Sequence, residues 1–283
     1  RIKKKYNLWH CLNQNIKIEP FFNIPYLLTV HDVHFVTEGC AELQEKLKKQ
    51  FAEKLKRSSA IAYISEFAKQ DTHAHFEVPN IPEYVIYNGN TITDISIPTD
   101  YKPSLLPPKP YLFSIGDFSD RKNFMSLVEM LRFLPEYNLV LSGSNSSSYA
   151  EKLTEKVKQY GFENRVFQTG KIADLEKQYY LQNCEAFVFP SLREGFGIPP
   201  IEAMRFGKPV FLSNNTSLPE IGGEHSFFWD HYDPQYMAQT LRAGMEKFHG
   251  NRAFYENWYT ARAQSFNWKT TAEKYIEVYK SLL

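Results

Sequence analysis

Short apolar runs alternate with amphipathic stretches along most of the chain. Residues 26–30, 60–64 and 84–87 are apolar runs of strand length, so they predict buried strands in the first third of the sequence. Residues 42–56 mix charged and apolar positions at helical spacing and predict a helix between the first two strands. Asn88-Gly89 then ends the third strand with a strong turn signal.

A proline-rich segment follows over residues 98–110, with Pro98, Pro103, Pro107, Pro108 and Pro110. Proline has no backbone N–H, so this segment cannot form a regular helix or central strand and predicts a linker. We therefore expect an amino-terminal domain over residues 1–97 and a second domain over residues 111–264.

The pattern restarts after the linker with more regularity. Strands are predicted at 111–115, 139–142, 166–169, 186–189, 209–212 and 227–229, and helices at about 123–133, 149–160, 174–182, 199–206 and 235–248. Alternating strands and helices indicate an α/β fold with parallel sheets covered on both faces. Two such blocks predict two Rossmann-like domains facing a central cleft, with ligands at the carboxyl ends of the strands. The first block is short, so we expect the amino-terminal domain to be incomplete and the natural protein to have further residues before it.

Composition narrows the function classes. Apolar residues make up 43% of the chain, and 33 basic residues nearly balance 32 acidic ones for a net charge of +1. That balance argues against a disordered chain and against a dedicated nucleic-acid binder, which carries a basic excess. No apolar run reaches the roughly 18–20 residues needed to span a membrane. The three widely spaced cysteines fit neither a disulfide framework nor a zinc site and indicate a cytoplasmic protein. The Lys3-Lys4-Lys5 end leaves a peripheral contact with the inner face of a membrane open, although a solvated surface is the favoured explanation of this cluster.

The segment 189–204 carries the most specific candidate chemistry. A predicted strand ends at Pro190, a loop containing Glu194, Gly195 and Gly197 follows, and a helix starts near Pro199. The backbone N–H groups of Gly197 and Ile198 at this helix start would favour an anion such as phosphate. Glu194 and Glu202, on the loop and the first helical turn, could accept hydrogen bonds from sugar hydroxyls. Each acid alone is also explained as an ordinary solvated or helix-dipole charge.

Two further loops follow predicted strands. The first holds Gly116, Arg121 and Lys122, and its two cations could neutralise a diphosphate, although a capped helix with ordinary surface cations is an alternative. The second begins at His31, which could contact a substrate with Asp32 as its orienting partner, or could be a packed structural histidine. The sequence lacks a D-x-D pair, a G-x-S-x-G elbow, a P-loop and a G-x-G-x-x-G, and no histidine has further ligands at metal-binding spacing.

The run from Glu194 to Glu202 resembles the E-x7-E signature of retaining nucleotide-sugar glycosyltransferases of the GT-B fold, the group 1 or family-four set. Ile115-Gly116 with Arg121-Lys122-Asn123 looks like the family's donor loop, and Gly207-Lys208-Pro209-Val210 looks like a flanking segment. Ser265-Phe266-Asn267-Trp268 is similar to the start of a final helix, over 265–283, that crosses back to the amino-terminal domain. The family's acceptor-side glycine-rich loop has no counterpart in this sequence.

The resemblance implies a role for each matching residue. Arg121 and Lys122 would bind the donor diphosphate and stabilise the leaving group. Glu194, with the backbone of Gly197 and Ile198, would contact the donor sugar, and Glu202 would take the ribose hydroxyls. Ile172 would line the base and His31 would lie near the transferred sugar. Gly116, in the same loop as Arg121 and Lys122, is also expected among the donor-binding residues.

The implied activity is transfer of a hexose from a nucleotide diphosphate sugar to a glycan or lipid-linked acceptor, without a metal ion or cofactor. Surface polysaccharide or lipopolysaccharide synthesis is the expected setting, and overall resemblance suggests mannose from GDP-mannose. Two alternatives stay open. A nucleotide-sugar epimerase or a phosphorylase-like enzyme on the same fold would show an epimerised product or a pyridoxal-phosphate lysine. A non-catalytic sugar-nucleotide-binding subunit would bind UDP or GDP without turnover.

Overall fold

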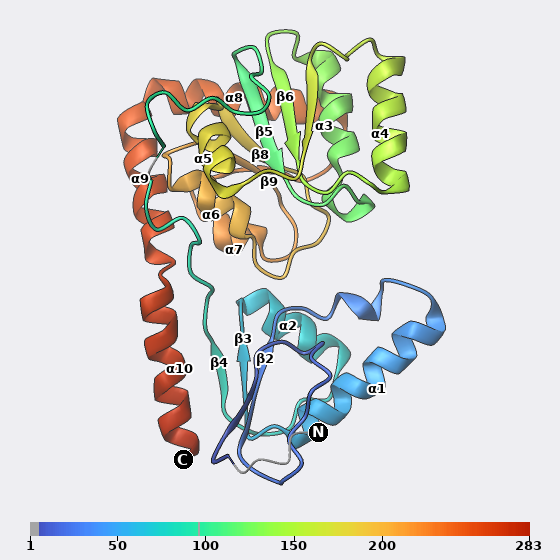
Figure 1. Cartoon of the computed structure of the whole chain (residues 1–283), viewed down its shortest axis with the longest axis vertical. Coiled ribbons are helices and arrows are strands. Elements are labelled where there is room, and N and C mark those ends of the chain that lie inside the picture. The colour runs from blue at the N-terminus through green and yellow to red at the C-terminus, as the bar shows by residue number, and fades with distance from the viewer. Residues whose placement is uncertain (1–5, 96) are drawn as a thin grey trace. The chain divides into compact units, whose positions relative to one another are not determined.

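The computed structural model describes residues 6–95 and 97–283, which form two compact units (Figure 1). The first unit comprises the described residues up to Gly89, together with Glu194–Phe196 and Asn267–Leu283. The second comprises the described residues of Asn90–Arg193 and Gly197–Phe266. Residues 3–5, which the sequence offered for a membrane contact, lie outside the described residues. No helix in the described part of the chain is long and apolar enough to cross a membrane.

The first unit is built on a parallel sheet of four strands in the order β1-β2-β3-β4. Its strands are β1 (Trp9–Cys11), β2 (Tyr26–Val30), β3 (Ala60–Tyr63) and β4 (Glu83–Val85). The α-helices of the unit are α1 (Ala41–Arg57), α2 (Glu66–His75) and α10 (Trp268–Leu282). Every residue of β2 and β3 is buried, which explains why their sequences are continuous apolar runs rather than alternating ones.

Helices cover both faces of this first sheet. Phe51 and Leu55 of α1 pack with Leu28 and Val30 on one face. On the other face, Val278 of α10 packs with a cluster that includes Leu27, Ala60, Ala62 and Ile86. Figure 1 shows α10 beside β4, although the two elements are far apart in the sequence. The last helix therefore completes the core of the first unit.

The second unit contains a parallel sheet of six strands in the order β10-β9-β8-β5-β6-β7. The strands are β5 (Tyr111–Ile115), β6 (Asn138–Ser142), β7 (Val166–Gly170), β8 (Ala186–Phe189), β9 (Val210–Ser213) and β10 (Phe227–Trp229). The α-helices are α3 (Phe124–Met130), α4 (Ser148–Gln159), α5 (Asp174–Asn183), α6 (Ile198–Met204), α7 (Leu218–Gly222), α8 (Pro234–Gly250) and α9 (Arg252–Ser265). β5 pairs with β6 on one side and β8 on the other, so its carboxyl end lies at the centre of the sheet.

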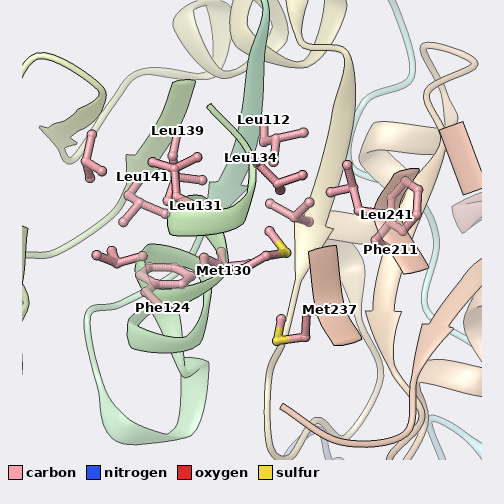
Figure 2. Packing of buried hydrophobic residues seen from close by; sticks show 14 of the residues in the cluster. Leu112, Phe124, Met130, Leu131, Leu134, Leu139, Leu141, Phe211, Met237 and Leu241 are labelled. Atoms are coloured by element: carbon pink, nitrogen blue, oxygen red, sulfur yellow. The ribbon is translucent and has the colours of Figure 1, made fainter. Parts of the chain in front are cut away.

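Two hydrophobic clusters sandwich this second sheet. Side chains alternate between the faces of a strand, so Leu112 belongs to one cluster and Phe113 to the other. Figure 2 shows Leu112, Leu139 and Leu141 of the sheet packed with residues of α3 and α8, among them Phe124, Met237 and Leu241. The opposite cluster takes residues of α5, α6 and α9, including Tyr180, Ala203 and Tyr259. Burial on both faces holds the strands, and with them the loops at their carboxyl ends, in fixed positions.

The structure confirms the predicted α/β architecture with parallel sheets, and each predicted strand corresponds to an observed one within one or two residues. The sequence analysis did not identify β1, α2, α7 or α9. Residues 98–110 contain no helix or strand and pack along the second unit, where the backbone N–H and the hydroxyl of Ser104 donate to Glu176 Oε1 at 2.7 and 2.5 Å. The Tyr180 hydroxyl donates to the Leu105 carbonyl at 2.6 Å.

Candidate functional site

The loop after β5 is shaped to carry the side chain of Lys122. A Cβ atom on Gly116 would lie 3.0 Å from Lys122 Cε, so the glycine leaves room for the aliphatic part of the lysine. Lys122 is 8% exposed, and its ammonium lies 4.7 Å from the centre of the Phe189 ring. A cation over an aromatic face is stabilised by the quadrupole of the ring, which limits the cost of burying this charge. Asn123 then adopts a left-handed conformation with φ of 52°, and α3 begins at the next residue.

Hydrogen bonds join this loop to the loop after β8. The Arg121 carbonyl accepts from the Leu192 N–H at 2.8 Å and from the Ser191 hydroxyl at 3.1 Å. The Arg121 guanidinium donates to the Arg193 carbonyl at 3.0 Å. β5 and β8 are adjacent parallel strands, so their carboxyl ends meet at the same edge of the sheet. The structure therefore brings together the two loops that the sequence indicated, and places Arg121 at their junction.

The start of α6 offers few backbone donors. Gly197 precedes the helix with φ of 119°, a conformation that side-chain-bearing residues avoid, and Ile198 is the first helical residue. Pro199 and Pro200 follow and carry no N–H, so Gly197 and Ile198 supply the N–H groups at the beginning of this helix. These are the two residues for which the sequence predicted backbone contacts to a ligand.

Glu202 of α6 is held by side chains from two other segments. It is only 3% exposed, and its Oε1 accepts a hydrogen bond from Lys177 Nζ of α5 at 2.7 Å. The Thr91 hydroxyl donates to the same oxygen. Lys177 also lies 3.3 Å from Asp174 Oδ1. Sequence analysis missed Lys177, because no spacing pattern links it to an acid 25 positions away.

Ile172 lies after β7, the edge strand of the second sheet. It is half-buried and packs against the cluster that contains Phe113 and Phe187. The preceding Gly170 has φ of 71°, and its carbonyl accepts from the Gly143 N–H at 2.8 Å. Ile172 thus follows the carboxyl end of a strand parallel to β5 and β8, on the same edge of the sheet.

The remaining two candidates, His31 and Glu194, both lie in the first unit. A Cβ atom on Gly195 would lie 2.2 Å from the His31 carbonyl oxygen, so the backbone after Glu194 packs directly on the backbone at the end of β2. The Ser65 hydroxyl, at the start of α2, donates to the Gly195 carbonyl at 2.7 Å. Glu194 itself is 9% exposed. The fold of the first unit therefore brings His31 and Glu194 into neighbouring segments.

Asp32 does not have the orienting role that the sequence offers for it as one possibility. His31 Nε2 donates to the Leu12 carbonyl at 2.9 Å, and the His31 N–H donates to Gln14 Oε1 at 2.9 Å. Asp32 Oδ1 instead accepts from the His34 N–H at 3.1 Å. Asp32 precedes His34 by two residues, so its side chain can turn back to the backbone of its own loop. This local hydrogen bond competes with a contact between Asp32 and His31. With Nε2 as a donor, Nδ1 is the acceptor of the neutral His31 ring.

His31 also lines a pocket of about 400 Å³ within the first unit. The other lining residues come from β1, β2, the segment after β4, and α10 (His10, Leu12, Thr29, Asn88, Trp268, Thr271, Ala272, Tyr275, Ile276 and Tyr279). His10 bonds Tyr279 and Thr29 through its two ring nitrogens, each at 2.7 Å. Burial lowers the pKa of His10 to about 4, so this histidine is neutral near pH 7. Within the described residues, no group of three or more His, Cys, Asp or Glu side chains could hold a metal ion.

A family model described as "Glycosyl transferases group 1" matches residues 98–260, which is more than half of the chain. The chain belongs to the group 1 glycosyl transferases. The match covers the loops after β5 and β8 and all of α6, which contain Arg121, Lys122 and Glu202.

Curated relatives of this group 1 chain include two mannosyltransferases of Escherichia coli. The serotype-specific mannosyltransferase WbdA is 29% identical over a region that covers 80% of this chain but only 29% of WbdA. The O-antigen chain mannosyltransferase B is 27% identical, with 93% of this chain and 73% of the relative covered. The chain thus spans less than a third of the length of WbdA.

Solved structures establish the fold of this group 1 chain. Sucrose-phosphate synthase from Thermosynechococcus elongatus aligns with a TM-score of 0.76 at 20% identity, covering 98% of this chain and 74% of that one. HepE from Anabaena in complex with UDP-glucose aligns with a TM-score of 0.77 at 18% identity, covering 98% and 79%. The fold class is GT-B, as the sequence indicated.

Proposed function

We propose that this group 1 protein is a retaining glycosyltransferase that moves a hexose from a nucleotide diphosphate sugar to a glycan or lipid-linked acceptor. The relatives named as mannosyltransferases support mannose as the sugar and surface polysaccharide as the product. GDP-mannose is then the donor that we propose. HepE, whose structure was solved with UDP-glucose, supports a nucleotide diphosphate sugar as the class of ligand. We place the reaction in the cytoplasm, at the inner face of the membrane where a lipid-linked acceptor would lie.

The observation that carries the proposal is the junction of the β5 and β8 loops at Arg121. Cleavage of the bond between the sugar and the diphosphate leaves negative charge on the diphosphate. Arg121 and Lys122, fixed by hydrogen bonds and by packing on Phe189, supply positive charge there without a metal ion. Because these groups are already oriented before the reaction, they stabilise the developing charge at little reorganisation cost.

The other candidates take complementary roles. Glu202 accepts from the ribose hydroxyls, and Ile172 packs against the base. Glu194 accepts from hydroxyls of the donor sugar, while Gly197 and Ile198 donate backbone N–H groups to the donor. His31, with Nδ1 as its acceptor, lies beside the transferred sugar. Gly116 acts indirectly, because it leaves the space that Lys122 occupies.

Donor turnover by the double variant Arg121→Ala/Lys122→Ala tests this proposal. Loss of a single preorganised charge stabiliser costs about 10²–10³ in rate, so the double variant should lose at least about 10²-fold in both donor hydrolysis and transfer. Arg132→Ala/Lys158→Ala is the matched control, since it removes the same charge from exposed positions on the same unit. Unchanged hydrolysis and transfer in the Arg121/Lys122 variant, measured with GDP-mannose and UDP-glucose, would refute the proposed site.

A further inference from the structure

The ion pair between Lys177 and Glu202 is the most informative polar contact that the proposed reaction does not yet explain. The side chain of Glu202 is 4% exposed and that of Lys177 is 14% exposed. A carboxylate this deeply buried requires a partner, and Lys177 Nζ supplies it at 2.7 Å from Oε1. Burial lowers the pKa of Lys177, but the negative charge and hydrogen bond of Glu202, with a contribution from Asp174, raise that pKa by more. Lys177 therefore stays charged at neutral pH.

The carboxylate of Glu202 is occupied on one side only. Lys177 and Thr91 both donate to Oε1. Among the residues that the structure describes, none donates a hydrogen bond to Oε2. This oxygen is nevertheless not fully enclosed by protein atoms. Solvent therefore reaches Oε2, so this oxygen can accept a hydrogen bond from a ligand hydroxyl.

Holding α6 in place does not require this ion pair. Ile201, Ala203 and Met204 are fully buried, and the Asn90 side chain donates to the Ile201 carbonyl at 2.8 Å. Buried ion pairs also add little net stability, because desolvation offsets most of their attraction. What the pair does fix is the direction of the carboxylate, since two donors on Oε1 leave Oε2 as the oxygen presented to solvent.

We propose that Lys177, assisted by Thr91, is a positioning residue that holds Oε1 of Glu202 and so directs Oε2 at a ribose hydroxyl of the donor nucleotide. This inference rests on the proposed function, in which Glu202 accepts from the ribose. Lys177 does not touch the nucleotide itself. Its effect should therefore be confined to ligands that carry the ribose hydroxyls.

Titration calorimetry with ribose-modified nucleotides tests this inference. GDP and UDP are compared first, and the one that binds more tightly is measured beside its 2′-deoxy and 3′-deoxy analogues and inorganic pyrophosphate. A hydrogen bond to a charged group corresponds to about tenfold or more in affinity, so the wild-type protein should bind at least one deoxy analogue about tenfold more weakly. In Lys177→Met that penalty should fall below about threefold, whereas pyrophosphate affinity should stay within about twofold.

Three further variants complete the test. Lys177→Arg keeps the charge and should keep most of the penalty for the missing hydroxyl. Thr91→Val, at an exposed position, should reduce the penalty in part and decides the question if Lys177→Met does not fold. Lys158→Met, which removes an exposed lysine of α4, is the matched control and should leave every affinity unchanged.

The outcomes separate this inference from the proposed function. If Lys177→Met still binds the deoxy analogue a full tenfold more weakly than the parent nucleotide, the positioning role is overturned and the proposed function stays intact. If Lys177→Met does not fold, the same result in Thr91→Val leads to the same conclusion. A wild-type protein that binds neither GDP nor UDP contradicts the proposed function itself. A penalty present in the wild type, lost in Lys177→Met and retained in Lys158→Met supports both.

Discussion

Replacing Gly195 with alanine is the most direct structural test of the contact between the Glu194 segment and the end of β2. The added Cβ would lie 2.2 Å from the His31 carbonyl oxygen and 3.2 Å from Asp32 Cβ. The first of these neighbours is backbone, so it cannot swing aside as a flexible side chain would. Ordinary van der Waals contact begins near 3.4 Å, and the two segments must separate by about 1.2 Å to reach it.

That displacement should affect both stability and activity. Overpacking of this kind costs about 1–3 kcal/mol, which should appear as a lower melting temperature. Moving a group that contacts substrate by about 1 Å can cost about 10²-fold in rate, so kcat/KM for GDP-mannose should fall by about that factor. Affinity for GDP should change little, because Arg121, Lys122 and Glu202 belong to the other unit.

Gly250→Ala is the matched control for this variant. A Cβ atom there would meet no atom within 4 Å, and Gly250 is the last residue of α8. Its melting temperature and kcat/KM should match those of the wild type. If Gly195→Ala also behaves like the wild type in both measurements, neither stability nor activity requires the close packing of Gly195 on His31.

Three other predictions follow from the structure. Burial lowers the pKa of His10 from 6.5 to about 4, so between these pH values the unfolded chain binds more protons than the folded one. The free energy of unfolding should therefore fall as pH drops from about 6.5 to about 4, by no more than about 1.4 kcal/mol per pH unit. In urea titrations, the free energy of unfolding of His10→Gln should depend less steeply on pH than that of the wild type. Gly143→Ala should displace the Gly116 carbonyl, which lies 1.8 Å from the added Cβ, and weaken GDP binding in calorimetry, whereas a wild-type affinity would contradict the close approach. Phe124→Ala, in the cluster of Figure 2, should destabilise the second unit by about 3–5 kcal/mol in denaturant unfolding, and a loss below about 1 kcal/mol would show that the site collapses around the cavity.

The parts of the candidate site that follow directly from strand order could be predicted from the sequence. The loops holding Arg121 and Leu192 both come after apolar runs, and parallel strands place their carboxyl ends on one edge. Gly197 could likewise be assigned to a helix start, because within a helix Pro199 and Pro200 are tolerated only in the first turn.

Side-chain partners could not be predicted in the same way. The sequence offers Asp32 as a possible orienting partner of His31, but in the structure Asp32 accepts from the backbone N–H of His34, a local contact that the sequence pattern does not reveal. Lys177 contacts Glu202 only because α5 and α6 pack on the same face of the second sheet. Such pairings depend on which helices and strands pack together, and a single sequence predicts the helices and strands without predicting how they pack.

The position of α10 has a consequence for how the protein is made. Val278, Tyr275 and Tyr279 cover a cluster with Leu27 and Ile86 from the first sheet. The ribosome synthesises these three residues of α10 only after residues 90–266 have been made. The residues of the first unit that precede residue 90 therefore keep this apolar face uncovered until α10 has been synthesised.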